Sequence, residues 1–106
     1  MEHPLKTLWE KPSRLVIGFM SGTSADGVDA ALVRITGFGT QTRAEQLGFC
    51  FVPFSDEVRA EILRLAGGDP ASAADFCRMN FLLGELFCEA GEALCAQTGT
   101  KLSDID

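Results

Sequence analysis

Positive charge is scarce in this sequence, which has 9 Lys and Arg against 15 Asp and Glu and a net charge of −6. A surface of this sign repels polyanions, so we expect neither a nucleic acid nor an anionic membrane as a partner. The sequence also lacks an apolar run approaching the roughly 20 residues that cross a bilayer. Residues 1–14 carry charges and two prolines where a signal peptide needs its apolar stretch, and we therefore expect a cytoplasmic protein.

Closely spaced cysteine pairs are also absent. We expect reduced thiols, because the cysteines form no CxxC pair of the kind found in zinc and redox sites. The single histidine, His3, lies near the N-terminus and is not a candidate catalytic group. With 106 residues, the chain suits one globular domain and is too short for a two-lobed enzyme. The four cysteines are Cys50, Cys77, Cys88 and Cys95.

Three segments have the composition of β-strands. Residues 14–20 form a short apolar run rich in branched and aromatic side chains, as in a strand buried on both faces. Residues 28–35 and 43–54 follow after glycine-containing turns, and Pro53 ends the last strand because proline has no N–H for the ladder. Three such strands in series predict an antiparallel meander. Residues 1–13 show no period and predict a flexible N-terminal arm.

Two helices are predicted after the strands. Ser55 is a suitable N-cap for a helix that ends near Gly67. Ser72, with Asp75 three residues on, predicts a capping box for a longer helix that runs to about Thr98. The predicted fold class is α/β, with a three-stranded antiparallel meander followed by two helices.

The longer helix has three distinct faces when its residues are placed about 100° apart. An apolar line should face the core, and a line of small side chains beside it should bury three cysteines as small hydrophobes. The charged side chains should face solvent. The apolar line is Phe76, Leu83, Phe87 and Leu94; the small line is Cys77, Gly84, Cys88 and Cys95; the charged face is Arg78, Glu85, Glu89 and Glu92.

Residues 18–29, G-F-M-S-G-T-S-A-D-G-V-D, are the segment with a chemical signature. Gly22 would let the backbone approach a phosphate, and the N–H groups of the turn can form an anion-binding nest. Thr23 and Ser24 would add hydroxyl donors. No Gly-Lys-Ser follows, and a strand rather than a helix comes next, so the segment is neither a Walker loop nor a dinucleotide-binding motif.

Two carboxylates bear on this phosphate hypothesis. Asp26 and Asp29 would repel a nucleotide unless Mg²⁺ or its bound water lies between them and the phosphates. Asp26 is therefore a candidate magnesium ligand. The alternative is an ordinary hairpin loop, in which Asp26 and Gly27 make the turn and the hydroxyls bond the nearby backbone.

The run G-F-M-S-G-T-S-A-D-G-V-D-A-A-L-V resembles the N-terminal signature of the anhydro-N-acetylmuramic acid kinase family, which belongs with the sugar kinases, Hsp70 and actin. A second stretch, N-F-L-L-G-E-L-F-C-E-A at residues 80–90, resembles a helix pattern of the same family. The closing S-D-I-D resembles the run into the family's next strand, which we expect to begin near Ile105. Residues 14–106 would then be the N-terminal part of an actin/hexokinase/Hsp70-like (ribonuclease-H-like) domain with a phosphate-binding hairpin, roughly the first third of a family member.

The resemblance implies an ATP-dependent carbohydrate kinase of peptidoglycan recycling. Such an enzyme opens the 1,6-anhydro ring of anhydro-N-acetylmuramic acid with water and yields N-acetylmuramate 6-phosphate, with ATP and Mg²⁺ as cofactors. The family's catalytic base would lie beyond residue 106, so we expect no activity from this chain alone. By position, the ATP-binding segment is Gly22, Thr23, Ser24, Ala25, Asp26, Gly27, Val28 and Asp29.

Two arrangements remain open for the assembly and role of the chain. The family resemblance implies a homodimer. The alternative function is a phosphate-binding or interaction lobe without catalysis, which pairs with a complementing chain through the apolar edge that missing strands would expose.

Overall fold

The computed structural model describes residues 3–106. It begins with a short helix, α1 (Pro4–Glu10), where the sequence predicted no regular structure. Pro4 at the first helical position and the side chain of His3, which accepts a hydrogen bond from the N–H of Leu5, explain how so short a helix starts. Residues 1–2 of the predicted arm lie outside the described residues.

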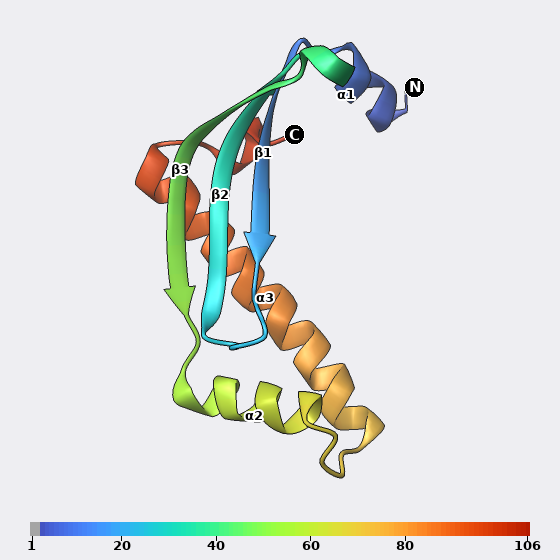
Figure 1. Cartoon of the computed structure of the whole chain (residues 1–106), viewed down its shortest axis with the longest axis vertical. Helices are drawn as coiled ribbons and strands as arrows, with labels where there is room; N and C mark the ends of the chain where they lie inside the picture. Colours follow the sequence, from blue (N-terminus) through green and yellow to red (C-terminus); the bar gives the residue numbers. More distant parts are fainter. Residues whose placement is uncertain (1–2) are drawn as a thin grey trace.

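The sheet is the predicted antiparallel meander, with β2 at its centre and β1 and β3 at its edges (Figure 1). Each strand lies within a residue or two of its predicted bounds. A 3₁₀ turn, η1 (Gly39–Gln41), joins β2 to β3. The strands are β1 (Ser13–Met20), β2 (Gly27–Thr36) and β3 (Arg43–Pro53).

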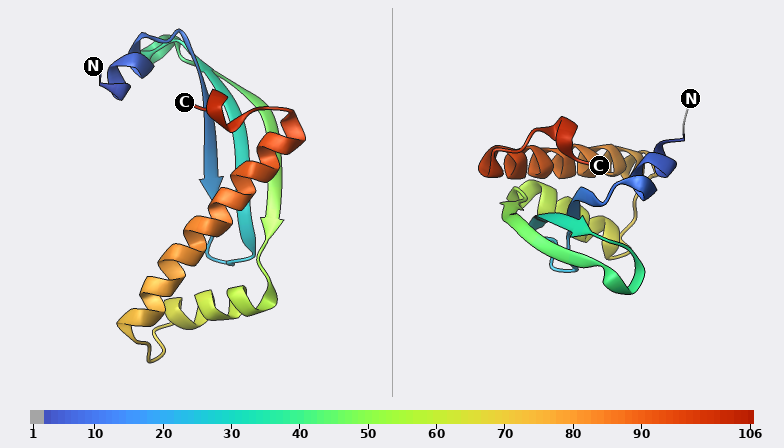
Figure 2. Two further views of the ribbon diagram at one scale, coloured as in Figure 1. Left: turned by 180° about the vertical axis from the view of Figure 1, so that it is seen from behind. Right: turned by 90° about the horizontal axis from the view of Figure 1, so that it is seen from above.

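The core lies between one face of this sheet and the long helix α3 (Ala73–Thr98), which crosses the sheet diagonally (Figures 1 and 2). Alternate residues of β2 point to α3 because successive side chains of a strand face opposite sides. Val28, Ala30 and Leu32 are buried there against Ala90 and Leu94 of the helix. The opposite sheet face is covered by no described helix.

Local capping signals determine where both large helices begin and end, as predicted. Ser55 caps α2 (Asp56–Ala66) by accepting a hydrogen bond from the N–H of Val58 at 3.2 Å, and the helix ends at Gly67. Ser72 and Asp75 form the capping box of α3, and Gly99 ends it in the left-handed conformation.

The predicted burial of the small line on α3 is correct for Cys95 and wrong for Cys77 and Cys88, which are exposed. For Cys77 the reason is length: α3 extends well past the sheet, so its N-terminal half has no sheet to cover it (Figure 1). Phe76, in the predicted apolar line, is accordingly 54% exposed. Cys88 lies in the half beside the sheet, but its side chain lies next to exposed Glu92. The charged face is exposed as predicted.

No strand begins at Ile105 in the part of the chain that the structure describes. A 3₁₀ turn, η2 (Leu102–Asp104), occupies the predicted approach to it. The N–H of Asp106 nevertheless donates to the carbonyl of Leu15 at 2.9 Å, so the end of the chain lies alongside the free edge of β1.

Candidate functional site

The predicted phosphate-binding residues lie where β1 turns into β2. Residues 21–26 form the connecting loop, and it sits at the end of the sheet nearest α2 (Figure 1). Gly27, Val28 and Asp29 are the first residues of β2. The structure therefore divides the predicted site between an exposed loop and the start of a strand.

The turn does not have the geometry of a two-residue Asp-Gly hairpin. Met20 pairs with Asp29, which leaves a longer connection, and the positive φ of 51° falls on Ala25 rather than on Gly27. Ala25 is only 4% exposed, and its N–H donates to the carbonyl of Gly22 at 3.0 Å. Burial of a small side chain thus holds the loop in a conformation that costs a non-glycine residue about 1–2 kcal/mol.

The two glycines of the segment differ in what surrounds them. A Cβ on Gly27 would lie within 2.7 Å of the Cα of Pro53, so glycine is required by the close approach of β3. A Cβ on Gly22 would meet none of the surrounding atoms of the described residues within 4 Å, and its φ is not positive. Within residues 3–106, packing therefore gives no reason for glycine at position 22.

The exposed half of the loop presents donors. The backbone N–H groups of Gly22, Thr23 and Ser24 have no acceptor among the described residues, and neither hydroxyl of Thr23 and Ser24 is hydrogen-bonded there. Such a cluster of N–H and O–H donors fits the oxygens of a phosphate group.

The two acidic residues are separated by the structure. Asp26 lies in the loop, with its Oδ1 3.3 Å from the Nε of Arg59 in α2. Asp29 is half-buried in β2 and alternates with Val28, so it faces away from α3. No group of three or more potential metal-ligating side chains occurs in the described part of the chain. Any Mg²⁺ at Asp26 would therefore take most of its ligands from phosphates and water, which is usual for this ion.

Arg59 was missed by the sequence analysis. A topological signal could have found it: in a meander, the β1–β2 loop and the end of β3 lie at the same end of the sheet, so the helix after β3 starts beside that loop. A basic residue in the first turns of that helix is then a neighbour of the loop.

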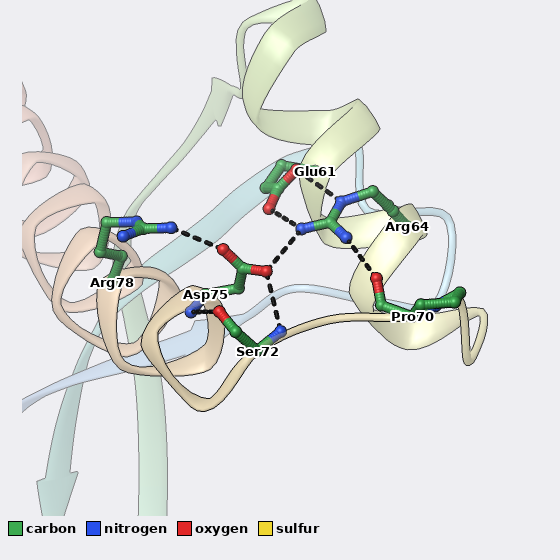
Figure 3. A network of polar contacts seen from close by, with 6 residues as sticks. All are labelled: Glu61, Arg64, Pro70, Ser72, Asp75 and Arg78. Carbon is green, nitrogen blue, oxygen red and sulfur yellow. Dashed lines mark hydrogen bonds and ion pairs between the residues drawn. The ribbon is translucent and has the colours of Figure 1, made fainter.

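A second polar network joins α2 to α3 (Figure 3). The guanidinium of Arg64 bonds both carboxylate oxygens of Glu61, the carbonyl of Pro70 and the carboxylate of Asp75. The pKa of Asp75 is lowered by the backbone N–H of Ser72 and by Arg64, and that of Glu61 by its hydrogen bonds with Arg64. These bonds connect the end of α2 to the start of α3.

A hollow of about 580 Å³ also lies at this corner, away from the loop. Its walls combine apolar side chains of α3, among them Met79, Phe81 and Leu82, with charged side chains of α2 and α3. It contains none of the predicted site residues.

No helix among residues 3–106 is long and apolar enough to span a membrane.

The sheet order, the helices that follow it and the loop between β1 and β2 define the N-terminal part of an ATPase-like domain of the sugar kinase, Hsp70 and actin class. The family described as anhydro-N-acetylmuramic acid kinase matches residues 14–106. The chain belongs to this family.

Two relatives illustrate the extent of the match. The anhydro-N-acetylmuramic acid kinase of Caldanaerobacter subterraneus subsp. tengcongensis is 46% identical over 102 residues, covering 96% of this chain and 26% of the relative. The kinase of the same description from Bacillus thuringiensis subsp. konkukian is 36% identical over 91 residues, covering 86% of this chain and 24% of the relative. The chain thus spans about a quarter of the length of these relatives, less than the expected third.

Proposed function

We propose that this chain supplies the nucleotide phosphate-binding loop of an anhydro-N-acetylmuramic acid kinase. The complete reaction would use ATP and water to open the 1,6-anhydro ring and phosphorylate O6, giving N-acetylmuramate 6-phosphate and ADP in the cytoplasm during peptidoglycan recycling. The observation that carries the proposal is the β1–β2 loop of a member of this family: N–H and hydroxyl donors with no partner among residues 3–106 surround Gly22, where packing of those residues does not require glycine.

The roles of the site residues follow from their positions. The N–H groups of Gly22, Thr23 and Ser24 would bind phosphate oxygens, with the two hydroxyls as further donors. Asp26 would approach Mg²⁺ through a bound water, and the ion would neutralise phosphate charge. Buried Ala25 and the close-packed Gly27 would keep the loop in shape. Val28 belongs to the core, and Asp29 would act as a structural or outer metal-binding group.

We assign no catalytic base to this chain. Positioning a water, neutralising phosphate charge and excluding solvent between two lobes require more than one loop on one sheet. The base, the adenosine pocket and most sugar contacts would belong to the remaining three quarters of a family member. We expect the chain alone to bind MgATP without phosphorylating the sugar.

A titration of the isotope-labelled chain with MgATP tests the proposal. Amide signals of residues 21–26 should shift in a saturable manner, and Thr23→Ala should weaken binding without lowering the thermal midpoint. Thr40→Ala is the matched control, because Thr40 lies exposed in η1 at the opposite end of the sheet. The proposal is wrong if the wild-type loop signals do not move, or if both threonine variants bind equally well.

A second candidate is a phosphate-binding lobe without catalysis that acts with a complementing chain. The exposed sheet face opposite α3, with Phe49 and Phe51 half-exposed on it, favours this candidate. Mass-spectrometric assay for N-acetylmuramate 6-phosphate tests it. Product formed by the chain alone would contradict this candidate and the expected inactivity together.

A further inference from the structure

We propose that Arg59 of α2 is a positioning residue of the β1–β2 loop and the counter-charge of Asp26. Its Nε donates to the carbonyl of Ser24 at 3.2 Å and lies 3.3 Å from Oδ1 of Asp26. One side chain thus contacts two residues of the loop, from a helix more than thirty positions further along the chain.

The place of Arg59 in its helix supports a role outside it. A cation near a helix N-terminus opposes the helix dipole, whereas Asp56 and Glu57 in the same turn favour it. Asp56 is three residues before Arg59 and could pair with it along the helix. In the described structure, Arg59 instead reaches the loop.

All anchors of the loop lie in its second half. Arg59 contacts Ser24 and Asp26, Ala25 is buried, and the N–H of Phe54 donates to the carbonyl of Asp26 at 2.9 Å. In the described chain, no hydrogen bond or ion pair from outside the loop reaches residues 21–23. Arg59 therefore holds the second half of the loop in place, and the donors of Gly22 and Thr23 in the first half stay accessible to a ligand.

The same contact changes the charge of the site. The carboxylate of Asp26 would repel an anionic ligand, and the guanidinium beside it offsets that charge before any ligand arrives. The ion pair uses Oδ1, so Oδ2 remains available to a hydrated Mg²⁺. This part of the inference rests on the proposed function, since it takes a polyphosphate as the ligand.

The network in Figure 3 attaches the helix that carries Arg59 to α3. Arg64, one and a half turns further along α2, ties that helix to the capping box of α3. Val58 and Ile62 pack α2 against the core beside Arg59. The loop is thus connected through Arg59 to the helix that covers the sheet.

Amide exchange of the chain without any ligand tests the positioning role. Arg59→Gln should speed exchange of the Ala25 and Phe54 amides by about three- to fivefold, because partly exposed ion pairs are worth at most about that factor. The Nε–H signal of Arg59 should shift in Asp26→Asn. Arg34→Gln is the matched control, since Arg34 pairs with Glu45 in the sheet. Unchanged exchange at Ala25 and Phe54 in Arg59→Gln would overturn the inference.

Affinity for MgATP and for magnesium triphosphate tests the charge. Arg59→Gln should raise the dissociation constant about three- to tenfold for both probes, and Arg59→Lys should recover most of the loss because the charge returns. Equal affinities of wild type and Arg59→Gln would overturn the counter-charge. A wild-type chain that binds neither probe would contradict the proposed function, while the exchange data would still decide the positioning role.

Discussion

At the scale of single residues, the two glycines of the loop should respond oppositely to the same substitution. Gly27→Ala places a methyl group against the backbone of β3, which cannot yield as a flexible side chain can. We expect it to lower the free energy of unfolding by about 1–3 kcal/mol. Gly22→Ala meets open space at a negative φ and should change stability by less than about 0.5 kcal/mol while weakening MgATP binding.

Urea denaturation and the MgATP titration measure both effects on the same pair of proteins. Each variant is the other's control, because the substitution is identical and the sites are five residues apart. A Gly22→Ala protein that binds MgATP as the wild type does would show that glycine at position 22 has no role in ligand approach.

Cys88 is exposed, yet its reactivity should be low. Its Sγ lies 3.7 Å from a carboxylate oxygen of Glu92, and the negative charge of Glu92 raises the pKa of the thiol above its ordinary value. Only the thiolate form of a cysteine is nucleophilic. Because the pKa of Cys88 is raised, less thiolate is present at neutral pH. Glu92→Gln should therefore speed alkylation of Cys88 by iodoacetamide at about pH 8 severalfold.

Peptide mass spectrometry follows this rate, with exposed Cys77 in the same helix as the internal control. The alkylation rate of Cys77 should be the same in wild type and Glu92→Gln, because Glu92 lies about four helical turns from Cys77. Equal Cys88 rates in wild type and Glu92→Gln would contradict the electrostatic explanation.

At the scale of elements, the limit of sequence prediction follows the range of the interactions. Ser55, the Ser72 capping box and Gly99 act within a few residues, and each fixed a helix end that the sequence alone predicts. The exposure of Cys77 depends on where the sheet ends beside α3, and the loop contact of Arg59 depends on how α2 leaves β3. Helical periodicity predicts which residues share a face of a helix. It does not predict which element covers that face, so it predicts neither the exposure of Cys77 nor the contact of Arg59.

The α2–α3 network should make stability depend on pH. The pKa of Asp75 is lowered by the Ser72 N–H and Arg64, so the unfolded chain binds a proton more readily than the folded one. The stabilisation is complete above the unfolded value of about 3.9 and is lost as pH falls through the lower folded value. Asp75→Asn should lose less stability than the wild type between about pH 6 and pH 3.

Urea midpoints at the two pH values measure this difference. Asp69→Asn is the control, since Asp69 makes no hydrogen bond or ion pair among the described residues and should leave the wild-type slope intact. Some slope should survive in Asp75→Asn, because the pKa of Glu61 is lowered by Arg64 and that of Asp106 by Lys11. Identical slopes for Asp75→Asn and wild type would mean that Asp75 does not contribute to acid stability.

At the scale of the whole molecule, helices of residues 3–106 cover the sheet on one side only. Helix α3 covers one face of the sheet (Figure 2), and the other face carries partly exposed apolar side chains. The molecule is correspondingly elongated, with extents of 49 × 31 × 27 Å. The large apolar side chains of this outer face that are more than a third exposed are Val16, Met20, Phe49 and Phe51.

An apolar sheet face of this kind should make the separate chain self-associate, because burying it removes apolar area from water. Sedimentation velocity should therefore show a mass that rises with concentration. Phe49→Lys places a charge on the outer face, where the phenylalanine is 48% exposed and its loss costs the core little, and it should shift the chain toward monomer. Phe81→Lys is the matched control on the projecting half of α3, where the side chain is 74% exposed. If Phe81→Lys dissociates the chain and Phe49→Lys does not, the contact surface is the exposed helix rather than the sheet.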